Sequence, residues 1–187
     1  MLYLIERINM KKIIHIFGAS GSGTTTLGKF ISTNFNFHQM DTDNYFWEKT
    51  NPPFLKKRNS EECINLILEE FNDFEQIVLS GSICGWGDQL IQYFSLAVEL
   101  IVPSDIRYKR IMIRELNTFG DRVMSDGDMY MQNLNFLEWA MGFDSYGPEH
   151  RSRIMHDAWI KKLNCPFLQI DGTKSLEEIG NQLIKYL

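Results

Sequence analysis

Residues 18–25 constrain this chain more than any other part of its sequence. They read Gly-Ala-Ser-Gly-Ser-Gly-Thr-Thr, follow the apolar run 13–17, and lead into residues 26–31, which have helical spacing. This order predicts a strand, a glycine loop and a helix. Glycines let such a loop turn its backbone N–H groups toward a polyphosphate, and the helix adds the positive end of its dipole. The candidate phosphate-binding residues are Gly18, Ser20, Gly21, Ser22, Gly23, Thr24 and Thr25.

The loop departs at one position from the phosphate-loop pattern G-x-x-x-x-G-K-[ST]. Gly18 and Gly23 match its glycines and Thr25 its hydroxyl residue, which can ligate Mg²⁺, but Thr24 stands in place of the lysine. That lysine normally places a cation on the transferring phosphates, so the charge has to come from elsewhere in the chain. The loop resembles the Gly-Ser-Gly-Thr-Thr-Thr loop of archaeal cytidylate kinases. This resemblance implies ATP and Mg²⁺ as cofactors and makes the lysine-less form compatible with phosphoryl transfer.

Composition limits the other possibilities. The chain has 187 residues, of which 44% are hydrophobic and 23% charged, as in a globular domain with a sizeable core. A net charge of −5 argues against a nucleic-acid binder, and no apolar run approaches the length of a membrane span. Cys63, Cys84 and Cys165 lack metal-ligand spacing and are expected as reduced thiols in the cytoplasm. We expect one domain over residues 10–187, a monomer or weak homodimer, with residues 1–9 as an N-terminal extension of little structure.

Apolar runs alternate with helical patterns along the chain, which favours a parallel sheet covered by helices. The predicted strands are 12–17, 36–40, 76–80, 96–102 and 166–170. The predicted helices are 24–34, 60–73, 88–94, 104–116, 128–142, 149–163 and 175–186. The carboxyl ends of parallel strands face the ligand crevice, so residues that directly follow the strands are the candidates for a site.

Two carboxylates, Asp41 and Asp43, follow the second predicted strand. They can hold Mg²⁺ and orient or deprotonate an acceptor hydroxyl, or one of them can simply cap the next turn. The Asp-Thr-Asp segment resembles shikimate and gluconate kinases, where a similar pair binds magnesium and the acceptor. The resemblance implies a metal site at Thr25 and Asp41 and an acceptor contact at Asp43.

The next segments carry further candidates for the acceptor site. Arg58 binds the acceptor if the resemblance to nucleotide and shikimate kinases holds, or it belongs to a solvated basic turn. Trp47 stacks on an acceptor ring or packs in the core. Gly81 follows the third predicted strand and permits a close approach of the backbone to the acceptor.

Arginines of the later helices are candidates for the missing cation. Arg107, Arg110 and Arg114 have i, i+3 and i+7 spacing, which places them on one helix face, either solvated or turned to the phosphates. In the adenylate-kinase group the corresponding helix leads into a lid and supplies arginines, so the resemblance favours Arg110 and Arg114. Arg151 is expected on the inward face of a second lid helix, where a buried arginine needs an anion.

Near the C-terminus, Asp171 follows a predicted strand whose end resembles that of nucleotide kinases, where the backbone packs against the adenine; alternatively, Asp171 caps the final helix. Together these features are typical of a three-layer α/β/α phosphate-loop kinase fold with a five-stranded parallel sheet and a helical lid, similar to adenylate, cytidylate and shikimate kinases. The resemblance implies transfer of the ATP γ-phosphoryl group to a nucleoside monophosphate or a hydroxy acid or sugar. Asp43, Arg110, Arg114 and Arg151 are the candidate catalytic residues. The alternative is a nucleotide-binding switch or weak ATPase with little kinase activity.

Overall fold

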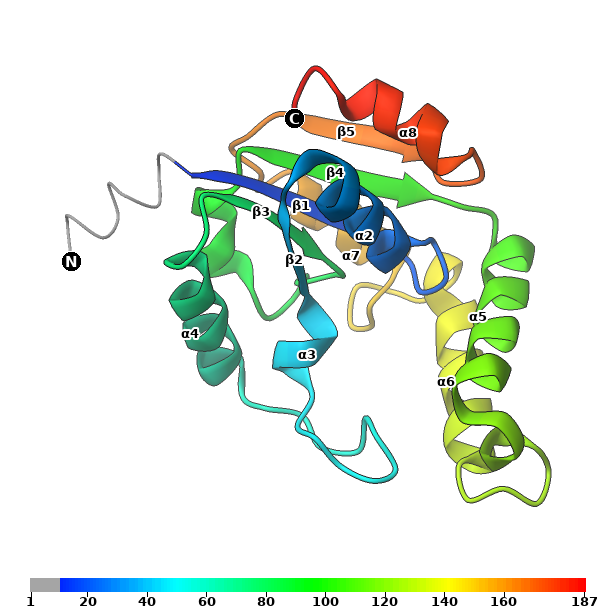
Figure 1. Ribbon diagram of the computed structural model, residues 1–187. Helices are drawn as coiled ribbons and strands as arrows, with labels where there is room; N and C mark the ends of the chain where they lie inside the picture. Colours follow the sequence, from blue (N-terminus) through cyan, green and yellow to red (C-terminus); the bar gives the residue numbers. More distant parts are fainter. Residues whose placement is uncertain (1–10) are drawn as a thin grey trace.

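A five-stranded parallel sheet forms the centre of the protein, with the strand order β2-β3-β1-β4-β5 (Figure 1). The computed structural model describes residues 11–187, so the predicted extension at residues 1–9 lies outside the described residues. The strands are β1 (Lys12–Gly18), β2 (His38–Asp41), β3 (Gln76–Ser80), β4 (Leu96–Ile101) and β5 (Phe167–Asp171). The predicted α/β class with five parallel strands is confirmed, and each predicted strand end lies within two residues of the observed one.

Seven helices and three short 3-10 helices connect these strands within residues 11–187. The helices are α2 (Thr24–Phe35), α3 (Thr42–Phe46), α4 (Ser60–Phe71), α5 (Ser104–Phe119), α6 (Tyr130–Met141), α7 (Arg153–Ile160) and α8 (Leu176–Leu183). The 3-10 helices are η1 (Asp88–Tyr93), η2 (Gly120–Val123) and η3 (Gly142–Asp144). The short helix α3 was not predicted. The helix predicted at 149–163 is shorter, because the Ser152 hydroxyl accepts the N–H of Met155 and fixes the start of α7.

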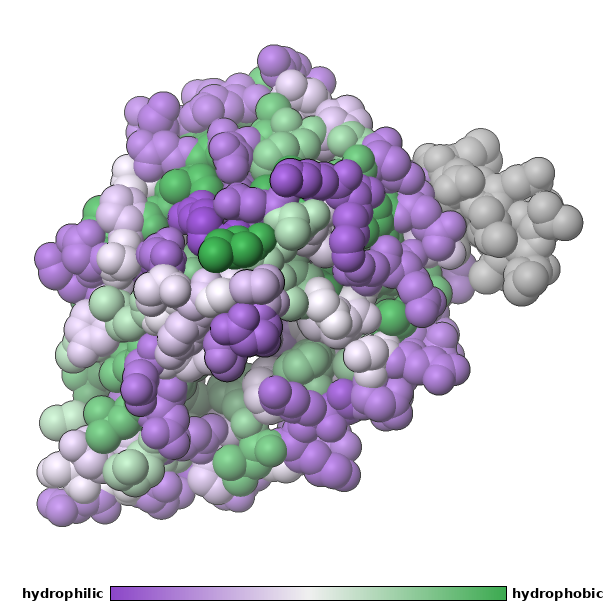
Figure 2. All heavy atoms as spheres, turned by 180° about the vertical axis from the view of Figure 1, so that it is seen from behind, coloured by the Kyte–Doolittle hydropathy of each residue, from purple (hydrophilic) through white to green (hydrophobic). Residues whose placement is uncertain are grey.

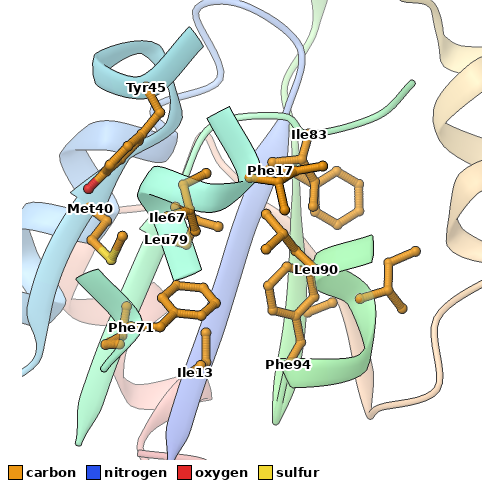
Figure 3. Packing of buried hydrophobic residues seen from close by; sticks show 14 of the residues in the cluster. Ile13, Phe17, Met40, Tyr45, Ile67, Phe71, Leu79, Ile83, Leu90 and Phe94 are labelled. Atoms are coloured by element: carbon orange, nitrogen blue, oxygen red, sulfur yellow. The ribbon is translucent and has the colours of Figure 1, made fainter. Parts of the chain in front are cut away.

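Alternation along β1 builds a core on each face of the sheet. Ile13 and Phe17 face one layer, which α4, η1 and α7 cover; Figure 3 shows Ile67 and Phe71 of α4 in this layer. Ile14 and Ile16 face the other layer, which α2 and α8 cover. Because both faces are buried, every residue of β1 from Ile13 to Gly18 is buried, as in a central parallel strand.

Helices α5 and α6 extend beyond the carboxyl end of β4 (Figure 1), where a lid was predicted. Arg107, only 2% exposed, fixes this pair to the rest of the protein: its Nε donates to Val102 O at 3.0 Å, and its guanidinium pairs with Asp144 of η3. Arg107 therefore does not share a solvated face with Arg110 and Arg114. None of the helices described is both long enough and apolar enough to cross a membrane.

Candidate functional site

The glycine loop lies between the end of β1 and the start of α2, as predicted. Gly21 and Gly23 adopt φ values of 81° and 98°, which favour glycine. A Cβ on Gly21 would also lie 2.6 Å from the backbone oxygen of Arg107, so α5 packs directly against the loop. The first turn of α2 has no side-chain cap, which leaves its N–H groups and the positive end of its dipole free for an anion.

A hydroxyl and a carboxylate meet beside this loop. Thr25 Oγ1 donates to Asp41 Oδ2 at 2.7 Å, while Asp41 Oδ1 accepts the N–H of Asp43 at 3.1 Å. The strand register brings them together, because Asp41 pairs with Ser80 and Ser80 with Ile16 of β1. Two oxygen ligands of this kind suit Mg²⁺. Residues 11–187 contain no group of three or more His, Cys, Asp or Glu that could hold a metal, so further ligands would have to come from phosphates or water.

Asp43 lies in the first turn of α3, which Asp41 caps. Its side chain is accessible to solvent but has protein on several sides, and this desolvation raises its pKa. The negative charge of Asp41 raises the pKa further, whereas Arg151 and Arg114 oppose the shift. Figure 2 shows a hollow between the α5–α6 pair and the segment around α3. Asp43 therefore combines access with an environment that favours proton uptake.

Arg151 faces this carboxylate from the segment before α7. Its guanidinium lies 5.6 Å from the centre of the Trp139 ring, and its Nη2 donates to Gly18 O at a long 3.4 Å. Its Nε is buried and has no hydrogen-bond partner among the described residues. Burial lowers the pKa of Arg151, and the charge of Asp43 opposes that shift. A cation therefore lies at the start of the glycine loop, and residues 11–187 leave most of its donors unused.

Arg110 and Arg114 also lie near the site, but the protein itself holds both. Arg110 donates to the backbone oxygens of Gly172 at 3.1 Å and Ser22 at 3.3 Å. Arg114 pairs with Glu115 at 2.7 Å and lies over the Phe136 ring. Their predicted contacts with phosphates would require these side chains to exchange partners.

Arg58 lies just before α4, and its guanidinium contacts the end of α3. It donates to the backbone oxygens of Tyr45 and Trp47, each at 2.7 Å, and to Asn44 O at 3.2 Å. Its role as an acceptor ligand stays a prediction, and it would require these bonds to break. Trp47 is half-buried and forms an edge contact with Phe46, with ring centres 5.1 Å apart.

Gly81 lies against Thr42, which a Cβ at this position would overlap. A tight packing of the loop after β3 therefore also accounts for this glycine.

At the end of β5, Asp171 does not cap the final helix. Ser175 caps it, in a capping box with Glu178, whereas Asp171 Oδ1 accepts the N–H of Thr173. The capping role expected of Asp171 was wrong.

Two aromatic residues of the site were not recognised in the sequence. Trp139 of α6 lies beneath Arg151, and Phe136 of the same helix lies beneath Arg114. Their i, i+3 spacing was the available signal, but the same spacing is typical of a core stripe.

Three solved structures share this fold at low sequence identity. A gluconokinase from Sinorhizobium meliloti 1021 has a TM-score of 0.50 and 13% identity, covering 94% of this chain and 91% of its own. A deoxyadenosine kinase from M. mycoides has a TM-score of 0.52 and 16% identity, covering 92% and 99%. A shikimate kinase from Bacteroides thetaiotaomicron has a TM-score of 0.53 and 17% identity, covering 92% and 98%. The chain therefore has the fold of phosphate-loop kinases.

Sequence comparison identifies a much closer relative. No family model matches the chain. The uncharacterized protein YqaC of Bacillus subtilis (strain 168) is 43% identical over 178 residues, which cover 95% of this chain and 98% of that protein. The chain belongs to the family of YqaC.

Proposed function

We propose that this protein is an ATP-dependent phosphotransferase that moves the γ-phosphoryl group of ATP to a small-molecule acceptor. The observation that carries the proposal is the convergence of four groups at the carboxyl edge of the sheet: the uncapped start of α2, the Thr25–Asp41 pair, Asp43, and the Arg151 cation. Phosphoryl transfer depends on positioning and on charge stabilisation, which these groups can supply together. The three solved structures with this fold are all named as small-molecule kinases.

The glycine loop and the first turn of α2 bind the ATP phosphates in this proposal. Thr25 and Asp41 hold Mg²⁺, which fits their oxygen atoms and supplies charge neutralisation on the phosphates when bound. Ser20, Gly21, Ser22 and Thr24 contribute loop contacts. Gly18 and Gly23 provide the turn at either end of the loop.

Asp43 orients the acceptor and takes the proton of its attacking hydroxyl. A raised pKa suits this role, since a stronger base accepts the proton of the hydroxyl more readily. Asp41, Gly81 and Arg58 are retained as further acceptor contacts in this proposal. The acceptor is a nucleoside monophosphate or a hydroxy acid or sugar.

Arg151 replaces the missing lysine as the cation on the transferring phosphate. It is the arginine of the site with the most unused donors, and it lies at the start of the loop. Arginine keeps its charge when buried and binds phosphate oxygens with two parallel hydrogen bonds. Arg110 and Arg114 add charge when the lid closes. We place the reaction in the cytoplasm, which agrees with the three free cysteines, and without nucleic-acid or membrane partners.

The test measures ATP affinity and acceptor-dependent ADP release with a panel of nucleosides, nucleoside monophosphates, sugars and hydroxy acids. Arg151→Ala should lower turnover by a factor of about a hundred to several thousand, because a charge is lost from an enclosed site. Arg153→Ala is the matched control, because this neighbouring arginine pairs with Asp144 at 3.3 Å. A partly exposed ion pair usually contributes about 1 kcal/mol or less, so its loss should change turnover only a few-fold.

Thr24→Lys should restore part of the turnover in the Arg151→Ala background, because a lysine fits this position in related loops. ATP binding without turnover on any acceptor would favour the nucleotide-binding switch instead. Failure of the folded wild-type protein to bind ATP would refute the phosphate-loop assignment.

A further inference from the structure

A chain of buried polar side chains lies behind Arg151, and the proposed phosphoryl transfer does not use it. Ser82, in the loop after β3, places its Oγ 3.2 Å from Nε2 of His156 on α7. Nδ1 of the same histidine lies 3.3 Å from Oε1 of Glu99 on β4. Gln169 of β5 donates to Glu99 Oε2 at 2.9 Å. His156 is 0% exposed, Glu99 1% and Ser82 6%, so three elements meet in a buried polar contact.

One protonation state satisfies every member of this chain. Burial lowers the pKa of His156, so its ring is neutral. Burial acts to raise the pKa of Glu99, but hydrogen bonds from His156 and Gln169 outweigh this effect, and the net shift is downward. Glu99 is therefore an anion that accepts Nδ1–H of His156, which leaves Nε2 to accept the Ser82 hydroxyl. The Ser82 oxygen in turn accepts the N–H of Cys84 at 3.3 Å.

The order serine, histidine, carboxylate also occurs in hydrolytic relays, but the location here does not suit one. A nucleophilic hydroxyl has to reach a substrate carbonyl. The Ser82 hydroxyl is buried, and its oxygen already accepts a backbone N–H. The chain of hydrogen bonds is better suited to holding elements in place.

We propose that the Ser82–His156–Glu99 chain positions Arg151 over the glycine loop, an inference that rests on the proposed function. Arg151 directly precedes Ser152, the N-cap of α7, and the N–H of His156 donates to Ser152 O at 3.0 Å. The first turn of α7 is thereby tied to β4 and to the loop after β3.

Arg151 depends on this support because its own contacts are weak. Its single hydrogen bond to the described part of the chain is the 3.4 Å contact with Gly18, and its Nε has no partner. The backbone that carries it therefore fixes where the guanidinium lies. His156 is a positioning residue, which acts through Arg151 and not on the substrate.

A double-mutant cycle on ATP affinity tests this coupling, with ATP and Mg²⁺ titrated by calorimetry into the full chain. Arg151→Ala should weaken binding by about ten- to a hundredfold and Ser82→Ala by about three- to tenfold, within the range measured for coupled neighbours. In the Arg151→Ala background, Ser82→Ala should cause no further loss. A merely structural role would not produce this non-additivity.

Ser95→Ala is the control for the loss of a serine hydroxyl, because Ser95 Oγ donates to Ile13 O at the opposite end of the sheet. Gln169→Leu is a second variant at a more exposed position, and it should show the same non-additivity with a smaller loss. Equal effects of Ser82→Ala and Ser95→Ala, or additive effects of Ser82→Ala and Arg151→Ala, would overturn the positioning role while leaving ATP binding in place. Wild-type protein that binds no ATP would instead overturn the proposed function and this inference with it.

Discussion

The stability of this protein should fall as the pH is lowered below the ordinary pKa of histidine, and His15 should contribute to the loss. His15 lies in the central strand β1 and is 0% exposed. Its ring stacks on Phe94, with ring centres 4.7 Å apart, and its Nδ1 lies 3.1 Å from Leu79 O. Its Nε2 is buried without a partner among the described residues. Desolvation therefore lowers the pKa of His15 from 6.5 to about 3.

The sign and the size follow from proton linkage. Between the two pKa values the unfolded chain binds a proton at His15 and the folded protein does not, so acid favours unfolding. A pH of about 5 lies about 1.5 below the ordinary pKa of histidine, so protonation of His15 stabilises the unfolded chain by about 2 kcal/mol. The folded histidine is still neutral at that pH, so folding gains nothing that would offset this loss.

Urea unfolding at about pH 7.5 and about pH 5, for the wild type and for His15→Phe, measures this contribution. The variant keeps a stacked ring and removes the titrating group. Its free energy of unfolding should change less between the two pH values, by about 2 kcal/mol. His156 and Asp43, whose pKa values shift in opposite directions, are present in both proteins, so the difference between the proteins reports chiefly on His15. Equal pH dependence in the two proteins would refute the assignment of a neutral, buried His15.

Two further substitutions test the glycine loop and the buried contacts of Lys11. Gly23→Val should abolish ATP binding and cost about 1–3 kcal/mol of stability, because a branched side chain has to adopt a φ of 98°. Calorimetry measures the ATP affinity and thermal unfolding measures the stability. An unchanged ATP affinity would contradict the loop assignment. Lys11→Met should lower the free energy of unfolding by about 2–4 kcal/mol, because the buried ammonium donates to the backbone oxygens of Phe71, Asn72 and Phe74 at 2.6–2.9 Å. Urea unfolding measures the change in this free energy. A loss below about 1 kcal/mol would contradict the stabilising role of these hydrogen bonds.

The central strands β1, β3 and β4 could be predicted because they are buried on both faces. Such strands are continuous apolar runs with clear ends, as residues 13–17 are. The glycine loop then indicated where the chain leaves β1 and enters α2. The helix α3 was missed because five residues are too short for a periodic pattern.

The candidate site was predicted less completely. Asp41 and Asp43 could be placed beside the loop because they lie at and just after the carboxyl end of a strand. The partners of the arginines could not be predicted, since Arg58 and Arg110 bind backbone oxygens that have no sequence signature. The contact of His156 with Ser82 and Glu99 joins residues at least 57 positions apart, and only the folded sheet brings them together.

The end of the described chain lies far from the candidate site. Lys12, at the first position of β1, donates through its Nζ to the backbone oxygen of Leu187, whereas the glycine loop follows the last position of that strand. A strand of seven residues is about 20 Å long. A dye, an affinity handle or a surface linkage attached after Leu187 should therefore leave ligand binding unaffected, so a sensor chip can carry this protein with its crevice open to the solution.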